Sequence, residues 1–234
     1  MMKCLSSEEE QVAENIRQIR ERMAEAAGKS GRSPSEVDLM AVTKTVPAER
    51  VNMALRAGIS LLGENRVQEC CEKYQNYTCK PETIHFIGHL QTNKIRDIID
   101  KIGMIESIDS LHLAAALEKE CEKRQMEMEI LLQVNIAQES TKSGFLLEQI
   151  PEAIERIHQD SPHLHMRGLM AIPPKDGGDL WFGKMQQLFE KEREREKSFT
   201  TLSMGMSGDF EQAIRYGSTQ IRIGTAIFGP RNYL

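Results

Sequence analysis

The sequence predicts an α/β fold in which eight parallel strands close into a (β/α)8 barrel. Short segments rich in Val, Ile and Leu alternate with amphipathic segments along the chain. Strands that alternate with helices form a parallel sheet with the helices outside it. The 234 residues match the size of one such barrel, about 250 residues, so we expect a single domain over residues 1–234. An open doubly wound sheet is the alternative, but no G-x-G-x-x-G motif follows the first strand.

An additional helix is predicted before the barrel, over residues 6–28. Ser6, with Glu9 three residues later, forms the pattern of a capping box. Gly28 is a typical helix end. One face is apolar, because hydrophobic residues recur at helical spacing: Val12, Ile16, Ile19, Met23 and Ala27.

The barrel itself is predicted over residues 38–229. Its predicted strands cover residues 39–43, 60–63, 83–87, 104–108, 128–135, 164–171, 200–204 and 220–223. Its predicted helices cover residues 48–57, 66–76, 92–101, 111–124, a short piece near 146, a longer piece from 151, then 179–197 and 209–216.

Composition and charge argue against several classes of protein. The formal net charge is −5 with both signs interspersed, whereas nucleic-acid-binding proteins usually carry a basic face. No apolar run approaches the roughly 20 residues that span a bilayer, and residues 1–10 lack the apolar centre of a signal peptide. The five cysteines form no C-x-x-C pair, so free thiols in a reducing cytoplasm are the simplest interpretation.

Candidate functional residues lie where the predicted strands end, because the sites of such barrels are built at the carboxyl ends of the strands. The first strand leads to Lys44 and the second to Asn65. The seventh runs into the glycine-containing turn 203–208, and the eighth leads to Gly224 and Thr225.

These last two strand ends predict a phosphate site. Ser207 and Gly208 precede a helix, where free backbone N–H groups attract anions. Gly224 and Thr225 add further N–H groups, and Thr225 adds a hydroxyl. Either motif alone is more often only a tight turn, but a phosphate site after strands seven and eight is a recurrent feature of barrels.

Arg222 lies in the last strand, where an aliphatic residue is expected. It is either an ion-paired residue of the barrel wall or a neighbour of the ring nitrogen of a pyridoxal cofactor, which requires an Asp or Arg partner. Arginine stays charged and only donates hydrogen bonds. It would keep the ring nitrogen unprotonated and the ring a weak electron sink, which suits mild chemistry or none.

Lys44 is interpreted as the attachment point of that cofactor. A lysine at a strand end can also be a surface residue whose amine extends into solvent. Burying an ammonium group is costly, and imine formation with an aldehyde removes that cost. We therefore predict a covalent Schiff base between Lys44 and pyridoxal 5'-phosphate (PLP).

Two other clusters are weaker candidates. His163 and His165, with His158 nearby, lie at the amino end of the sixth predicted strand, on the face of a barrel that serves stability. We expect no metal site there. Cys70 and Cys71 have no neighbouring histidine or C-x-x-C pattern, so we interpret them as structural thiols.

Six motifs in fixed order carry a resemblance to a known family. They are AVTKTVP at 41–47, GENRVQE at 63–69, HFIGHLQ at 85–91, RGLMAIP at 167–173, LSMGMS at 202–207 and IRIGTAIFG at 221–229. With them the chain resembles the pyridoxal phosphate homeostasis proteins (the YggS/PROSC family) over nearly its whole length. The resemblance implies a barrel of the alanine racemase N-terminal type. It also implies PLP on Lys44, a phosphate around Ser207, Gly208, Gly224 and Thr225, Arg222 at the ring nitrogen, and Asn65 near the cofactor.

The resemblance also implies a function. Members of that family carry or regulate PLP without robust catalysis, which implies a protein that buffers PLP and regulates vitamin B6 and amino-acid pools. PLP-dependent apoenzymes are the candidate acceptors, a monomer or weak dimer is the expected state, and no catalytic or metal-binding residue is assigned.

Two alternatives remain open. One is a weak PLP-dependent amino-acid racemase, which needs a second acid/base group on the other face of the cofactor. The nearest candidates are His85, His89 and Asp109. The tyrosines are expected in helices or at the terminus, away from the barrel mouth: Tyr74, Tyr77, Tyr216 and Tyr233. The other alternative is a phosphate-binding barrel in which Lys44 is unmodified.

Overall fold

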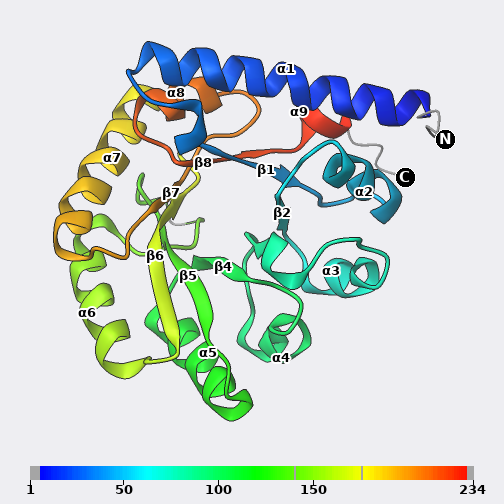
Figure 1. Cartoon of the computed structure of the whole chain (residues 1–234). Helices are drawn as coiled ribbons and strands as arrows, with labels where there is room; N and C mark the ends of the chain where they lie inside the picture. The colour runs from blue at the N-terminus through cyan, green and yellow to red at the C-terminus, as the bar shows by residue number, and fades with distance from the viewer. Residues whose placement is uncertain (1–5, 140, 175, 231–234) are drawn as a thin grey trace.

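The computed structural model describes residues 6–139, 141–174 and 176–230, and in this part of the chain eight strands close into a barrel (Figure 1). Neighbouring strands are parallel and follow chain order, and the last strand pairs with the first. The predicted barrel is therefore confirmed. The strands are β1 (Asp38–Val42), β2 (Leu61–Glu64), β3 (Ile84–Phe86), β4 (Met104–Ile108), β5 (Met128–Val134), β6 (Leu164–Ala171), β7 (Thr201–Ser203) and β8 (Gln220–Ile223).

Helices form the outer layer, and each of them buries apolar side chains toward the sheet or toward its neighbours. Residues 92–101 were expected as one helix, but residues 92–94 form a 3-10 turn and only a short α-helix follows. In the described ranges, no helix is both long and apolar enough to cross a membrane. The helices are α1 (Ser7–Lys29), α2 (Ala48–Arg56), α3 (Val67–Tyr74), α4 (Ile95–Ile98), α5 (Leu111–Arg124), α6 (Ile150–Asp160), α7 (Gly178–Arg195), α8 (Phe210–Arg215) and α9 (Thr225–Phe228).

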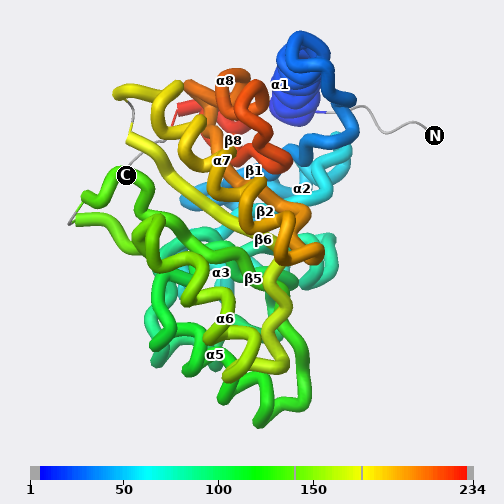
Figure 2. Tube along the Cα trace, turned by 90° about the vertical axis from the view of Figure 1, so that its left-hand side faces the viewer, coloured from blue at the N-terminus to red at the C-terminus, as the bar shows by residue number. Residues whose placement is uncertain are grey.

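The helix α1 lies outside the ring, against α2, α8 and α9, as two perpendicular views show (Figures 1 and 2). The predicted cap is present, because Ser6 Oγ accepts a hydrogen bond of 3.2 Å from the N–H of Glu9. The second half of the predicted capping box is wrong, since the Glu9 carboxylate binds Arg56 of α2 at 2.6 Å instead. Asn15 donates to the carbonyl of Ile227 at 2.9 Å. The helix therefore bridges the first and last parts of the barrel.

The barrel interior is partly polar. Successive side chains of a strand point to opposite faces, and in β8 Ile221 and Ile223 belong to the main apolar core. Gln220 and Arg222 alternate with them and face inward. Three inward methionine and leucine side chains form a small separate cluster: Met104, Leu131 and Met170. The interior also holds a buried polar group: His85, Glu106, Ser203, Gln220 and Arg222.

Candidate functional site

All seven residues that the sequence assigns to the cofactor site line one cavity of about 600 Å³ at the carboxyl ends of the strands. They follow β1, β2 and β7, or lie in or directly after β8. The cavity joins an amine, a guanidinium group and a set of backbone and hydroxyl donors. The seven residues are Lys44, Asn65, Ser207, Gly208, Arg222, Gly224 and Thr225. Apolar surface comes from Val42, Ile87, Ile172 and Met206.

Lys44 lies in a tight turn that follows β1. The Thr43 carbonyl accepts a hydrogen bond of 3.0 Å from the N–H of Val46, so Lys44 and Thr45 are the central residues of the turn. Thr45 has a φ of +62°, which is unfavourable for a β-branched residue. Its N–H donates to Glu69 at 2.5 Å. Strain of this kind persists only where surrounding contacts fix it, and it is concentrated at functional sites.

A buried charge cluster holds this turn. Lys73 of α3 donates to the Thr43 carbonyl at 2.9 Å and pairs with Glu64 at 2.8 Å and Glu69 at 2.9 Å. Glu64 is fully buried and also accepts from the Thr43 hydroxyl at 2.7 Å and from the Tyr77 hydroxyl. Burial and the Glu64 carboxylate raise the pKa of Tyr77. The sequence missed this cluster and expected Tyr77 in a helix, whereas it lies in the loop after α3.

Asn65 carries an unsatisfied polar atom beside the cavity. Within the described part of the chain, its Oδ1 is buried and has no hydrogen-bond partner. Buried polar atoms are rarely left without a partner, so this atom fits a position for a ligand group. Gly88, at the end of β3, allows the close packing here, because a Cβ on it would lie 2.0 Å from the Asn65 carbonyl oxygen.

The turn between β7 and α8 lines the cavity with backbone N–H groups. The Asp209 carboxylate holds the turn together by accepting a hydrogen bond from the N–H of Met206 at 2.6 Å. Among the hydrogen bonds of the described residues, the N–H groups of Ser207 and Gly208 have no acceptor. A Cβ on Gly208 would meet no atom within 4 Å, and its φ lies outside the left-handed region. Neither packing nor backbone conformation requires glycine here, so its absent side chain leaves space for a ligand.

Gly224 and Thr225 complete this part of the cavity lining. Gly224 has a φ of −114°, and a Cβ on it would make only ordinary contacts with Val42, at 3.4 Å or more. Thr225 begins α9, a short helix that the sequence analysis did not predict. The N–H groups of Ile227 and Phe228 donate to the Gly224 carbonyl at 3.0 Å, whereas those of Thr225 and Ala226 have no acceptor among the described residues.

Arg222 is buried between the barrel interior and the cavity, with 4% of its surface exposed. Its Nη1 donates to Ser203 Oγ at 2.7 Å and its Nη2 to the Ala171 carbonyl at 2.8 Å. Burial lowers the pKa of Arg222, and the Glu106 carboxylate opposes that shift. The side chain remains charged, as arginine does in proteins. Among the described residues it forms no direct ion pair and reaches the Glu106 carboxylate through the Ser203 hydroxyl, so the ion-paired wall residue considered from the sequence is an indirect one.

The sequence analysis missed that carboxylate, Glu106. Its Oε1 contacts Nδ1 of His85 at 2.7 Å and Nε2 of Gln220 at 2.6 Å, and its Oε2 contacts Ser203 Oγ at 2.6 Å. Burial acts to raise the pKa of Glu106, but the hydrogen bond and charge of His85, with the charge of Arg222, bring it below its ordinary value. The sequence feature that could have identified Glu106 is its position as a charged residue at the centre of β4, an otherwise largely apolar strand.

The candidates for a second acid/base group, His85, His89 and Asp109, lie elsewhere. None of them is among the described residues that line the Lys44 cavity. His85 is inside the barrel, and the exposed His89 pairs with Asp109 at 3.0 Å. His89 lines a neighbouring cavity of about 270 Å³, together with Asn135 and Lys142. The two cavities share Asn65, Ile87 and Ile172.

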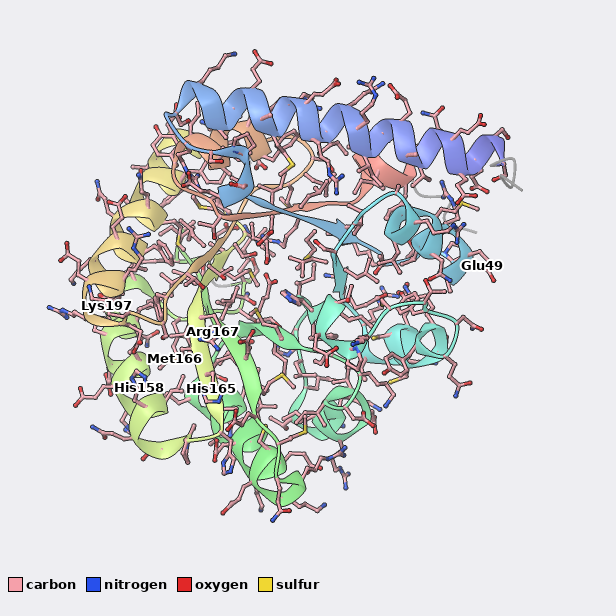
Figure 3. The ribbon with its side chains drawn as sticks, in the orientation of Figure 1. Glu49, His158, His165, Met166, Arg167 and Lys197 are labelled. Carbon is pink, nitrogen blue, oxygen red and sulfur yellow. The ribbon has the colours of Figure 1, made fainter. Side chains whose placement is uncertain are left out.

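The histidines near the amino end of β6 each bind a different carboxylate. Figure 3 shows His158 and His165 beside α6 and β6. Within the described ranges, no group of three or more His, Cys, Asp or Glu residues is arranged to hold a metal ion. The pairs are His158–Glu196 at 3.0 Å, His163–Glu118 at 2.6 Å and His165–Glu127 at 3.0 Å.

The four described cysteines are free thiols, whereas Cys4 and Tyr233 lie outside the described residues. Burial raises the pKa of Cys70 to about 12. Burial also raises the pKa of Cys71, with smaller effects from nearby charges. Both thiols are therefore poor nucleophiles, as the sequence analysis expected.

Sequence comparison places the chain among known proteins. The family described as alanine racemase, N-terminal domain, matches residues 8–232. The pyridoxal phosphate homeostasis protein of Pseudomonas aeruginosa is 40% identical over 223 residues, which cover 95% of this chain and 96% of the relative. The chain therefore belongs to the family of the pyridoxal phosphate homeostasis proteins. The pyridoxal phosphate homeostasis protein of Escherichia coli K12 is 39% identical over 229 residues, covering 95% of this chain and 97% of the relative.

Solved structures agree with membership of the pyridoxal phosphate homeostasis family. PipY of Synechococcus elongatus, solved with PLP bound, has a TM-score of 0.78 at 29% identity over 93% of this chain and 100% of its own. The structure of PipY without PLP has a TM-score of 0.81 at 30% identity, with the same coverage. Alanine racemase of Corynebacterium glutamicum, at 14% identity and a TM-score of 0.72, shares the fold over 97% of this chain and 64% of its own. The expected barrel of the alanine racemase N-terminal type is confirmed.

Proposed function

We propose that this protein binds PLP in the Lys44 cavity and buffers it, as a carrier in vitamin B6 and amino-acid homeostasis without robust catalysis. The convergence of an amine, a buried arginine and two glycine-containing turns on one cavity carries this proposal. The names of the curated relatives and the PLP-bound structure of PipY support it.

The residues of the cavity fit the groups of PLP. Lys44 would hold the aldehyde carbon as a Schiff base, and Arg222 would donate to the ring nitrogen. The unsatisfied Oδ1 of Asn65 and the open space at Gly208 are features that the fold does not explain and that a bound ligand would. When bound, PLP supplies an aldehyde that condenses with primary amines. The phosphate would be held by Ser207, Gly208, Gly224 and Thr225.

A carrier accounts for the site better than the racemase alternative. Racemisation needs acid/base groups on both faces of the cofactor, but His85, His89 and Asp109 stand outside the described lining of the cavity. Arg222 cannot accept a hydrogen bond, so it favours an unprotonated ring nitrogen. An unprotonated ring is a weak electron sink, and this supports storage rather than turnover.

The decisive experiment is an absorption spectrum of the purified protein mixed with PLP, before and after borohydride reduction, followed by peptide mapping. We expect a reduced pyridoxyl group on Lys44. Lys44→Ala should lose this label, whereas Lys142→Ala, at the neighbouring cavity, is the matched control and should keep it. A label on another lysine in the wild-type protein, or none at all, would contradict the proposal.

We further propose that the protein acts in the cytoplasm as a monomer or weak dimer and hands PLP to PLP-dependent apoenzymes. Free thiols at the four described cysteines support a reducing compartment. Sedimentation tests the oligomeric state. Transfer is tested by mixing the loaded protein with a PLP-free apoenzyme in the presence of an excess of an amine that traps free PLP. The activity of the apoenzyme should recover faster than when the same concentration of free PLP is added with the same amine.

A further inference from the structure

The buried polar group inside the barrel forms one connected chain of hydrogen bonds. Arg222 Nη1 contacts Ser203 Oγ at 2.7 Å, and Ser203 Oγ contacts Glu106 Oε2 at 2.6 Å. Gln220 Nε2 contacts both Ser203 Oγ, at 3.0 Å, and Glu106 Oε1, at 2.6 Å. His85 Nδ1 ends the chain on Glu106 Oε1 at 2.7 Å. Strands β3, β4, β7 and β8 are thereby joined across the interior.

The direction of these hydrogen bonds follows from the donors available. Arginine has donors only, so Ser203 must accept from Arg222. Its single hydroxyl proton is then free to be donated to Glu106, the acceptor among its neighbours. Glu106 must therefore accept at Oε2, as an ionised carboxylate does. Its charge lies one hydroxyl away from the charge of Arg222.

This arrangement fixes the guanidinium group from the side opposite the cofactor cavity. Both terminal nitrogens of Arg222 have partners in the barrel wall, Ser203 and Ala171, and neither partner lines the cavity. A buried charge without a counter-charge is costly. Glu106 supplies the larger counter-charge and Asp209 a smaller one, and Ser203 bridges Arg222 and Glu106.

We propose that Glu106 is a positioning residue for Arg222, acting through the Ser203 hydroxyl to hold the guanidinium group toward the ring of the bound cofactor. The effect on the cofactor rests on the proposed function; the coupling of Glu106 to Arg222 does not. Glu106 is not among the described residues that line the cavity, so we expect its removal to act on the cofactor through Arg222.

The test compares Glu106→Gln with Glu118→Gln in the full chain. Glu118 is the matched control, because it is also a largely buried carboxylate bound to a histidine, at 2.6 Å from His163, but it lies far from the cavity. We expect Glu106→Gln to shift the absorption maximum of the bound PLP and to weaken PLP binding about tenfold, the loss of one charge-assisted hydrogen bond. Glu118→Gln should change neither. An unchanged spectrum and affinity in Glu106→Gln would overturn the proposal.

A double-mutant cycle separates positioning from general loosening of the barrel. In the Arg222→Gln background, Glu106→Gln should weaken PLP binding no further, because the residue through which it acts is gone. Independent losses that multiply would contradict the proposal. Ser203→Ala, which keeps both charges and removes the bridge, should reproduce the spectral shift if Glu106→Gln fails to fold.

One measurement needs no cofactor. In the PLP-free protein, the Nε–H resonance of Arg222, assigned by its loss in Arg222→Lys, should move in Ser203→Ala and Glu106→Gln and stay in place in Glu118→Gln. If the wild-type protein takes up no PLP, the proposed function fails while this resonance still decides the coupling. A resonance unmoved by Glu106→Gln would overturn it.

Discussion

The amine of Lys73 donates a hydrogen bond of 2.9 Å to the carbonyl of Thr43, the residue before Lys44. The same amine pairs with Glu64 and Glu69, at 2.8 and 2.9 Å. Lys73 therefore holds the Thr43 carbonyl and the Glu69 carboxylate. Glu69 in turn accepts a hydrogen bond from the N–H of Thr45, in the Lys44 turn. The geometry of the proposed attachment point depends on a cation that stands outside the cavity.

Lys73→Met should destabilise the protein by about 3–5 kcal/mol, because it leaves the buried Glu64 carboxylate without its cation. It should also slow borohydride-trapped loading of Lys44, since the turn loses its anchor. Thermal unfolding and the rate of labelling are the measurements. Lys29→Met, which removes an exposed pair with Glu25, is the control and should cost less than about 0.5 kcal/mol. Equal losses in both variants would rule out an anchoring role for Lys73.

Gly208→Val should reduce PLP affinity at least about tenfold while leaving the melting temperature within a degree or two. The side chain would enter open space that the phosphate is proposed to occupy, at the expense of charge-assisted hydrogen bonds. Gly88→Ala differs in its effect on stability, because its Cβ would collide with the Asn65 backbone and destabilise the fold by about 1–3 kcal/mol. Fluorescence titration and thermal unfolding distinguish the two. Tight PLP binding by Gly208→Val would remove this turn from the phosphate site.

Thr45→Asn should stabilise the PLP-free protein by about 1 kcal/mol, since Asn tolerates the left-handed conformation that Thr45 adopts at φ +62°. Denaturant unfolding measures the gain. Thr43→Asn serves as the contrast, because it disturbs the buried hydroxyl bond to Glu64 without relieving strain. A loss of stability in Thr45→Asn would show that this turn is not strained.

The His163–Glu118 pair should make stability depend on pH. The hydrogen bond that the His163 ring donates to the Glu118 carboxylate, outweighing desolvation, raises the pKa of His163 above its ordinary value. A raised folded-state pKa contributes stability that is fully present below the unfolded value, about 6.5, and is lost as the pH rises through the folded value. The melting temperature of the wild-type protein relative to His163→Gln should therefore be higher at pH 5.5 than at pH 9. A difference that grows with pH would contradict this assignment.

The proposed site residues could be predicted because, in a closed barrel, residues that follow the carboxyl ends of the strands lie close together. Lys44 and Asn65 follow β1 and β2, whereas Thr225 follows the distant β8, and closure of the barrel brings the ends of these strands together. The family resemblance then named the same positions. No pairing register is needed for this step, since all carboxyl ends of the strands lie on one face.

The supporting residues could not be predicted in the same way. Glu106 meets Ser203 and Gln220 only because the register of non-adjacent strands places them at one height inside the barrel. The Glu64–Lys73 pair depends on how α3 is oriented against β2. The left-handed conformation of Thr45 opposes its intrinsic preference, so local propensity pointed away from it. The four-residue helix α9 is too short to show a helical period.

The pairing of Met40 with Arg222 joins β1 to β8 and closes the barrel. A ribosome synthesises Lys44 long before Thr225, so the nascent chain carries the proposed attachment point before the opposite wall of the cavity exists. During translation, β1 has an unpaired edge, which is an aggregation hazard, and closure must wait for a non-local contact that forms slowly. The proposed capture of an aldehyde together with its phosphate thus requires a completed barrel. A chain that terminates before β8 would retain the lysine but not the ability to sequester the cofactor.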